Sequence, residues 1–523
     1  MKKPIWIVSL VLSVVLIGVA IFYIALPAIS FRSSGFWWYL VIMSVIAGII
    51  TLIQMFREDN FWWAPAIPWD IAGLLLLVIA VISLCGSQLN SKAYRDALEF
   101  EESSFQDDFS DILESGKPVT MDFETAWSLG DRVLGGIPNA SDYEVDGYTL
   151  IVYQGRPTWL GSLRYRTFHQ IGIPGYILVD CETYEARFVE TTEPIKIVPS
   201  ALFGNNLKRH LRGQFLGYVF ESSIFEVDDE GNPWWVTAVS ESQAGLWGCR
   251  VADKAILTDP FSGESQVYEL GNIPEWVENV LSLDYLMKRA QWHFTYLNGW
   301  WRGTFGDRIA KLSYAYKSDT FAGYTFFVAS DGHVKVITGV TPSNKTESNI
   351  GFLTMDTATG KIQYYAIPGA EESSAQDIAE DLVRATGFKA TFPVMQNVDG
   401  EPVYMMQMKG ILSALIQRYA LVDYRNRSIA YVGEDIETAL EGFLKLKSVG
   451  SDVASTDSIS GLIEEKIQAE IDGTTVFYYR IGDKLYKAPI TISEYQVLIK
   501  TGDQVEFEYV DGEIRQVVQI KLD

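Results

Sequence analysis

The residues best suited to chemistry in this chain recur at one spacing. The stretch TMDTATGKIQYY, residues 354–365, holds a carboxylate at Asp356, a hydroxyl at Thr359 and a permissive backbone at Gly360 between two apolar segments. Such a stretch is either a ligand loop or a tight turn. The same pattern of strand, Asp, small polar residue and strand recurs at residues 176–190, 255–270 and 419–433. Since an Asp side chain bonds nearby backbone amides and Gly accepts a left-handed turn, all of these stretches predict β-hairpins.

Other patterns that would support catalysis or metal binding are few. The histidines fall in separate segments, without the spacing of a metal motif: His169, His210, His293 and His333. A Gly-x-Ser-x-Gly nucleophile motif is absent. The acidic pair Asp228 and Asp229 lacks the alternating ligands and closing Glu of a calcium loop, so it predicts a turn. We expect no metal, no cofactor and no enzymatic activity, although carboxylates gathered from distant segments leave a hydrolase open.

A cluster of aromatic and cationic side chains is the best candidate for a protein interface. It lies in and around the Gly-rich stretch NGWWRGTFGDR and comprises Trp292, Trp300, Trp301, Arg302 and Arg308. Trp and Arg are the residues most enriched among those that carry the binding energy of protein interfaces. The alternative is that these side chains fill a buried linker between two repeats.

Hairpins and helices repeat together along the chain. A turn of the Asp-Gly or Asp-Asp-Glu-Gly kind precedes each Asp hairpin, within residues 143–161, 225–239, 326–340 and 393–408. Amphipathic helices are expected before these sets, at residues 123–134, 202–220, 275–292 and 372–386, and one more is expected after the last set, from Ile436. One helix packed on a four-stranded antiparallel sheet makes a two-layer unit, so the sequence predicts tandem α+β repeats.

Three apolar runs open the chain, at residues 5–26, 36–56 and about 66–85, and each is close to the length that crosses a bilayer. A cleaved signal peptide is the alternative for the first run, but that run is longer than a signal h-region and two more runs follow it. Lys2 and Lys3 favour a cytoplasmic N-terminus. After three spans, residues 88–523 are then expected on the extracytoplasmic side of the cell membrane.

The charge of the chain restricts the class of binding partner, and its cysteines raise the question of a disulfide. The 523-residue chain has a net charge of −24, and its C-terminal segment 456–523 holds 7 basic and 13 acidic residues. An acidic surface repels phosphates, so no nucleic-acid partner is expected, and Tyr478, Tyr479 and Tyr486 are expected on a sheet face. Cys181 and Cys249 are either one disulfide or two buried thiols, and buried thiols are expected.

The predicted fold class is a membrane-anchored α+β protein with a small C-terminal β-barrel. Short strands joined by Asp-Gly and Gly-Asp turns indicate a barrel of the OB or SH3-like sort. The expected boundaries are a three-span anchor at 1–87, repeats at 88–195, 196–292, 293–370 and 371–447, a linker at 448–461 and the barrel at 462–523.

The repeats resemble the PepSY-type domain, in which an acidic helix precedes a "dG.pvY.V" strand and a "VDa.TGev" hairpin. The matching stretches are IAEDLVRATG, VDGEPVYMMQM and ALVDYRNRSI in the fourth repeat, FLTMDTATGKI in the third, and ETAWSLGDRVLGGIP with ILVDCETYEA in the first. VDYRNRS lacks the Thr-Gly, and the histidine pairs of membrane PepSY reductases are missing. The resemblance implies an extracytoplasmic domain that binds peptides or proteins.

Together these observations predict an extracytoplasmic scaffold protein of a bacterial-type envelope assembly. Its expected partners are the membrane and other envelope proteins, or further copies of itself. The alternatives are a PepSY-like regulator that binds and restrains a peptidase, and an envelope hydrolase.

Overall fold

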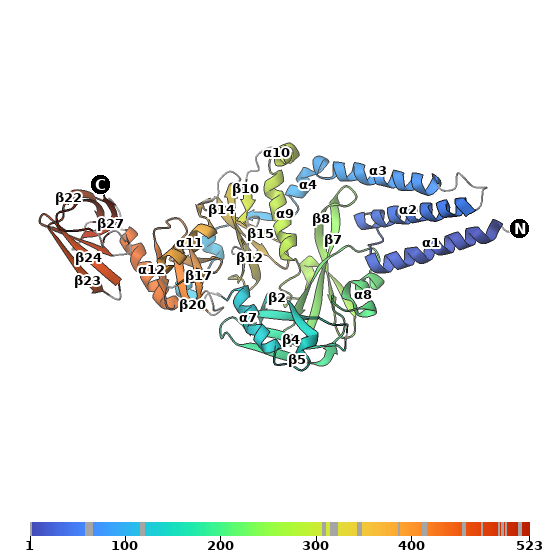
Figure 1. The fold of residues 1–523 in the computed structure, drawn as a ribbon, viewed down its shortest axis with the longest axis horizontal. Coiled ribbons are helices and arrows are strands. Elements are labelled where there is room, and N and C mark those ends of the chain that lie inside the picture. Colours follow the sequence, from blue (N-terminus) through green and yellow to red (C-terminus); the bar gives the residue numbers. More distant parts are fainter. Residues whose placement is uncertain are drawn as a thin grey trace. The chain divides into compact units, whose positions relative to one another are not determined.

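A computed structural model gives the fold of the chain (Figure 1). It describes residues 3–57, 66–115, 121–168, 170–305, 310–313, 323–342, 348–384, 387–410, 416–451, 457–471, 474–489, 492, 496, 499–510 and 515–522. The chain forms two compact units. The first consists of Met1–Gln376, Thr391–Tyr404 and Leu412–Leu415, and the second of Asp377–Ala390, Met405–Ile411 and Ile416–Asp523.

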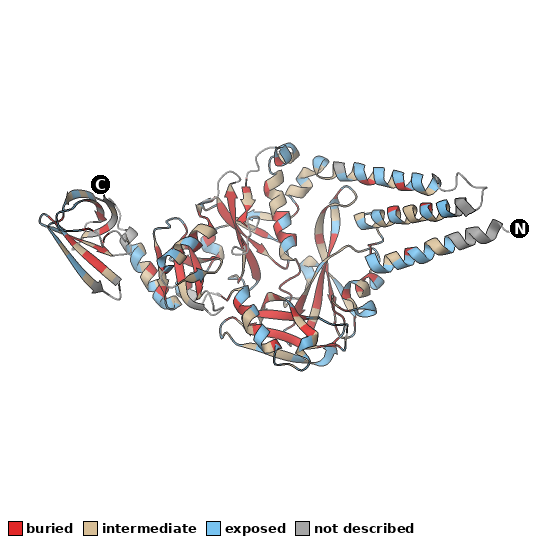
Figure 2. Cartoon of the chain, viewed as in Figure 1, coloured by how far each residue is buried: buried red, intermediate tan, exposed pale blue. Residues whose placement is uncertain are grey.

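Apolar helices open the first unit: α1 (Lys3–Ala25), α2 (Ser34–Arg57) and α3 (Ala66–Leu89). Many of their large side chains are exposed rather than packed, including Leu16, Leu74 and Leu77 (Figure 2). By length and composition, α2 and α3 can cross a membrane, and the described part of α1 adds a shorter apolar run. This exposed apolar surface is consistent with a membrane anchor.

The first two repeats have the predicted helix and four-stranded antiparallel sheet. The first contains α7 (Phe123–Leu134), β2 (Tyr143–Tyr153), β3 (Arg156–Tyr165), β4 (Ile173–Asp180) and β5 (Ala186–Ile195), with the strands side by side in sequence order. The second contains α8 (Leu207–Gln214), β6 (Phe220–Val227), β7 (Pro233–Ala244), β8 (Gly248–Thr258) and β9 (Ser265–Glu269), again in sequence order.

The third sheet is larger and includes a strand that follows soon after the apolar helices in the sequence. Its strand order is β1-β15-β14-β12-β10, with β11 also paired to β12. The elements are β1 (Phe100–Glu102), α9 (Leu283–Tyr296), β10 (Ala310–Leu312), β11 (Thr325–Val328), β12 (Val334–Pro342), β14 (Gly351–Asp356) and β15 (Ile362–Tyr365). β1 runs parallel to β15, so the segment expected in the first repeat lies in the third sheet.

The fourth repeat combines α11 (Glu372–Leu382) and α12 (Ile436–Ser451) with a five-stranded sheet. Its strands are β17 (Phe388–Ala390), β18 (Val394–Val398), β19 (Glu401–Gly410), β20 (Ile416–Asp423) and β21 (Ala430–Gly433). The predicted linker is shorter than expected, because α12 ends at Ser451 and the next strand begins at Asp457.

The prediction of a closed C-terminal barrel is wrong for the described residues, where six strands form an open sheet. They are β22 (Asp457–Leu462), β23 (Glu465–Ile471), β24 (Thr474–Ile481), β25 (Lys484–Pro489), β26 (Gln504–Val510) and β27 (Arg515–Leu522), in the order β22-β26-β27-β25-β24-β23. The edge strands β22 and β23 are joined only by the chain, which bends at Ile463 and Glu464. The Ile463 amide donates to the Asp503 carbonyl and the Glu464 amide to the Arg480 carbonyl. These hydrogen bonds do not pair β22 with β23, so the sheet stays open.

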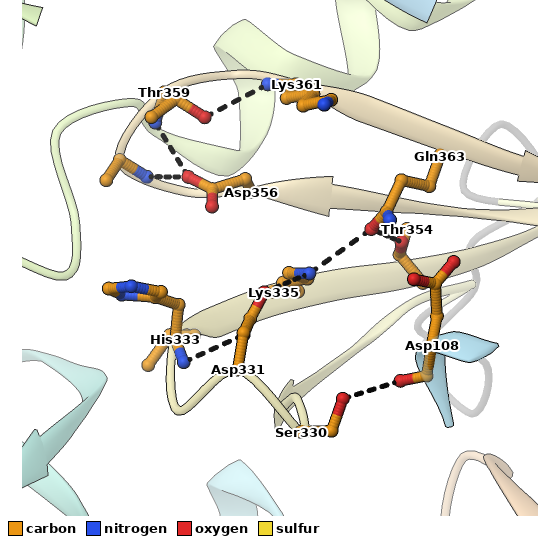
Figure 3. Close-up of polar contacts among 12 residues, drawn as sticks. Asp108, Ser330, Asp331, His333, Lys335, Thr354, Asp356, Thr359, Lys361 and Gln363 are labelled. Atoms are coloured by element: carbon orange, nitrogen blue, oxygen red, sulfur yellow. Dashed lines mark hydrogen bonds and ion pairs between the residues drawn. The ribbon is translucent and has the colours of Figure 1, made fainter. Parts of the chain in front are cut away.

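The stretch around Asp356 is a capped turn (Figure 3). Oδ1 of Asp356 accepts hydrogen bonds from the amides of Ala358 (2.9 Å) and Thr359 (2.7 Å). The amide of Gly360, with φ of +79°, donates to the Asp356 carbonyl at 3.0 Å. Equivalent Asp caps occur at Asp180, Asp259 and Asp423. The predicted Asp hairpins are therefore confirmed.

One predicted turn is wrong. Asp146 and Gly147 form no turn but an irregularity inside β2, where the pairing with β3 shifts register. The chain reverses instead at Gln154 and Gly155, both with positive φ (53° and 75°). Two consecutive left-handed residues match the right-handed twist of a hairpin, so this pair is the better turn.

A short buried connector, residues 277–281, joins the first three repeats. The side chain of Asn279 donates to the Leu150 carbonyl of β2 and to Oε1 of Glu226 on β6, both at 2.8 Å. Oε2 of Glu278 accepts from the Val334 amide of β12 at 3.0 Å. Each of the three sheets therefore supplies a hydrogen-bond partner to a buried polar side chain of the connector. These hydrogen bonds hold the sheets in place against one another.

The first prediction concerns the Asp356 turn. Gly360→Ala should destabilise the protein by about 1 kcal/mol or more, because an L side chain is strained at positive φ. Its Cβ would also approach Leu281 Cδ1 to 2.8 Å. Gly147→Ala is the matched control, since nothing lies within 4 Å of its Cβ and its φ is not positive. Thermal unfolding measures both variants, and equal losses would contradict the turn assignment.

The second prediction concerns Glu226, whose side chain is fully buried. Burial raises its pKa well above the ordinary value, with the nearby Glu278 carboxylate adding to the shift. A raised pKa contributes stability that is full below the unfolded value, about 4.3, and is lost as pH rises through the folded value. Glu226→Gln should therefore raise the unfolding midpoint at pH 8 and flatten its decline above pH 5.

The control is Glu230→Gln, on the exposed turn after β6. Glu230→Gln removes one carboxylate as Glu226→Gln does, but from an exposed site, so only the loss of the buried carboxylate distinguishes the two variants. A steeper decline with pH in Glu226→Gln than in the parent would contradict the prediction.

Candidate functional site

The residues considered for catalysis do not converge among those the structure describes. His210 hydrogen-bonds with the Gly263 carbonyl, and His293 does so with the Arg95 carbonyl. His333 lies within ion-pair distance of Glu278, at a third place. His169 lies outside the described residues. No group of three or more His, Cys, Asp or Glu side chains suited to a metal ion is found in the described ranges. Asp228 accepts hydrogen bonds from the Asn232 amide (2.7 Å) and Trp234 Nε1 (3.1 Å), which confirms the predicted turn.

The predicted Trp and Arg interface divides into two parts. Trp300, Trp301 and Phe305 form an aromatic cluster on α10 (Gly299–Phe305), with ring centroids 5.0–5.7 Å apart. Trp301 and Phe305 are each 73% exposed, which argues against a buried linker plug. Arg302 is exposed on the same helix, and Arg308 lies outside the described residues. The helix lies against α3 and α4 (Ser91–Arg95) (Figure 1).

Trp292 belongs to a different surface, on α9. Its ring packs edge-on against Tyr94 of α4 at 4.8 Å. The Arg289 guanidinium lies 5.3 Å from the same ring and 3.2 Å from that of Tyr285. The role of these side chains as a protein interface stays a prediction.

Arg212 holds the end of α1 on the second repeat, and sequence patterns did not single it out. The guanidinium is buried and donates to carbonyls on both sides: Leu26 (3.2 Å), Phe215 (2.8 Å), Leu216 (3.1 Å) and Tyr218 (2.7 Å). The Ile29 amide donates to the Leu216 carbonyl at 2.7 Å. Burial lowers the Arg212 pKa to about 10. The chain just after α1 is therefore fixed to the second repeat by hydrogen bonds that are at least partly buried.

The β7–β8 hairpin makes a second attachment at its tip. Trp247 packs on Trp37, three residues into α2, with ring centroids 5.9 Å apart. Arg250 on β8 donates to the Arg32 carbonyl, and Arg32 pairs with Glu241 of β7 at 3.4 Å. Arg32 and Glu241 are both exposed, so this ion pair adds little stability and mainly orients the hairpin.

A cavity of about 650 Å³ opens beside the β7–β8 attachment, among α3, α4, β8 and α9. Cations line it at Arg250, Lys288 and Arg289, and carboxylates at Glu221 and Asp284. Arg289 is paired with Glu221 at 3.4 Å. Aromatic walls come from Tyr94, Trp247 and Trp292, and α3 contributes Ile82, Ser83 and Gly86.

Cys181 and Cys249 are buried and free, which confirms the expected thiols and excludes their disulfide in this structure. Sγ of Cys249 donates to the Ala93 carbonyl at 3.1 Å. Burial raises its pKa to about 11, so the thiol is neutral and structural rather than reactive.

Comparisons with known proteins assign no family. No family model and no curated protein matches the chain. Among solved structures, a Trypanosoma rangeli sialidase aligns at 8% identity with a TM-score of 0.17, covering 72% of this chain and 54% of that one. Its complex with a difluoro-KDN inhibitor aligns at 8% identity with a TM-score of 0.16, covering 71% and 52%. The chain thus spans about half of these structures, and similarity this low carries no argument about fold or activity.

The third prediction tests the attachment of α1. Arg212→Met should destabilise the protein by about 3 kcal/mol, because several buried carbonyls lose their donor. It should also make residues 26–33 more accessible to protease. Lys208→Met is the matched control, since Lys208 is exposed on the same helix. Thermal unfolding of the full chain in detergent and limited proteolysis measure the two effects. Equal behaviour of the variants would contradict this role of Arg212.

Proposed function

We propose that the chain is a membrane-anchored scaffold protein whose repeats lie outside the cytoplasm and bind other envelope proteins or further copies of the chain. The observation that carries the proposal is the Arg212 attachment, because it fixes the repeats to the apolar helices. A rigid mount gives a binding surface a defined height and orientation at the membrane. A catalytic domain on a flexible tether has no need of such buried bonds.

The aromatic cluster of α10 supports a partner site close to the membrane. Trp301 and Phe305 expose large apolar surfaces beside Arg302, the residue types that anchor protein interfaces. The helix lies beside α3, so a partner bound here is itself close to the membrane. The PepSY resemblance favours a protein or peptide partner for the same surface.

A photoreactive residue at Trp301 tests this surface in intact membranes. We expect a crosslink to one protein at fixed stoichiometry, and none from the same residue at Phe168, which is 91% exposed in the first repeat. Capture of a peptidase would favour the regulator over the scaffold. Equal, non-specific labelling from both positions would contradict a partner site on α10.

The fourth prediction is the topology. With the N-terminus inside and three spans, a tag after Asp523 should be removed by protease added to intact cells with permeable outer layers. A tag before Met1 and a cytoplasmic marker should both survive. Protection of the C-terminal tag until the membrane is lysed would contradict the extracytoplasmic placement and the scaffold proposal with it.

A further inference from the structure

The cavity beside the end of α3 has the position of a lipid headgroup site, provided that the proposed membrane anchor is correct. Gly86 is three residues before the end of α3, which is about 5 Å at 1.5 Å per residue. Trp37 lies near the start of α2 and packs on Trp247, which lines the cavity. Trp residues are enriched at the level of lipid headgroups.

The charge of the cavity favours a phosphate. Its lining has three cations and two carboxylates, whereas the whole chain has 42 basic and 66 acidic residues. Arg289 is held by Glu221 and by the Arg250 carbonyl at 2.7 Å. Within the described part of the chain, the Lys288 ammonium has no ion pair and only lies 5.9 Å from the Trp292 ring. The Lys288 amine is thus free to bind an anion.

The α3 wall favours a lipid over a soluble anion. Ile82 and Gly86 line the cavity, and Val78, Leu75 and Ile71 continue the same face of α3 at helical spacing as an apolar surface that is at least partly exposed. A headgroup in the cavity would leave its acyl chains free to extend along this surface. A soluble phosphate would gain nothing from it.

We propose that this cavity binds the phosphate-bearing headgroup of a membrane phospholipid, with the Lys288 ammonium against the phosphate. Arg250 adds positive charge from β8, and Trp247 and Trp292 cover the glycerol region. A bound lipid would then contact α3, α9 and the β7–β8 hairpin at once. It would add to the β7–β8 attachment of the repeats to the apolar helices.

The test uses the full chain in a non-ionic detergent with dihexanoylphosphatidylglycerol as the probe, followed by native mass spectrometry. We expect one saturable probe per chain and an affinity about tenfold lower in Lys288→Gln, because a charge-assisted contact is lost. Lys288→Arg should retain binding. Lys208→Gln is the matched control, an exposed Lys on α8 near the end of α1 but outside the cavity lining. Its affinity should equal that of the parent.

Two further probes separate the sources of binding. A dihexanoylglycerol without phosphate should bind poorly, and inorganic phosphate at equal concentration should not displace the phospholipid. Equal binding of the uncharged lipid, displacement by phosphate, or equal loss in Lys208→Gln would each overturn the proposal. Extraction of the chain from native membranes by alkaline carbonate would instead overturn the membrane anchor. An anchored chain that binds no probe refutes only the lipid site.

Discussion

The arrangement of the first unit depends on satisfying the polar groups of one buried connector. Residues 277–281 have no regular structure of their own, so their amides and side chains need partners from outside. They find them on β2, β6, β12 and the Asp356 turn, where the Val280 and Leu281 amides donate to the Thr357 carbonyl. Displacing any one sheet would leave buried polar groups unpaired, which costs more than most surface contacts contribute. These hydrogen bonds thus act together with apolar cores that the repeats share, such as Tyr176 packed on Phe225 and Trp159 on Phe326.

The same principle operates where the apolar helices meet the repeats. A buried Arg is costly to desolvate, and Arg212 is accommodated because carbonyls from the ends of both elements surround it. The β7–β8 hairpin and the cavity beside it complete this junction. Together they bring cations, carboxylates and aromatic rings from several elements around the end of α3.

Local features were predictable from the sequence, and long-range ones were not. The Asp caps at Asp180, Asp259, Asp356 and Asp423 were predicted because each involves only residues within one turn. The prediction of a turn at Asp146 and Gly147 was wrong because an Asp-Gly dipeptide suits a bulge inside a strand as well as a turn. Closure of the C-terminal sheet depends on edge pairing, which no local pattern specifies. Arg212 was missed because an Arg on a short helix has the composition of a solvated face until the carbonyls around it are known.

The parallel pairing of β1 with β15 has a consequence for the order of synthesis. Phe100 is made early, directly after the apolar helices, but its partner Ile362 follows two complete repeats. Until the third sheet emerges, β1 is an unpaired strand directly after the apolar helices, and an unpaired strand edge invites wrong partners. The first two repeats can form within this interval because their strands pair in sequence order. β1 can therefore pair only once β15 of the third sheet has been synthesised. A nascent chain stalled before that point would carry two folded repeats and one unpaired strand.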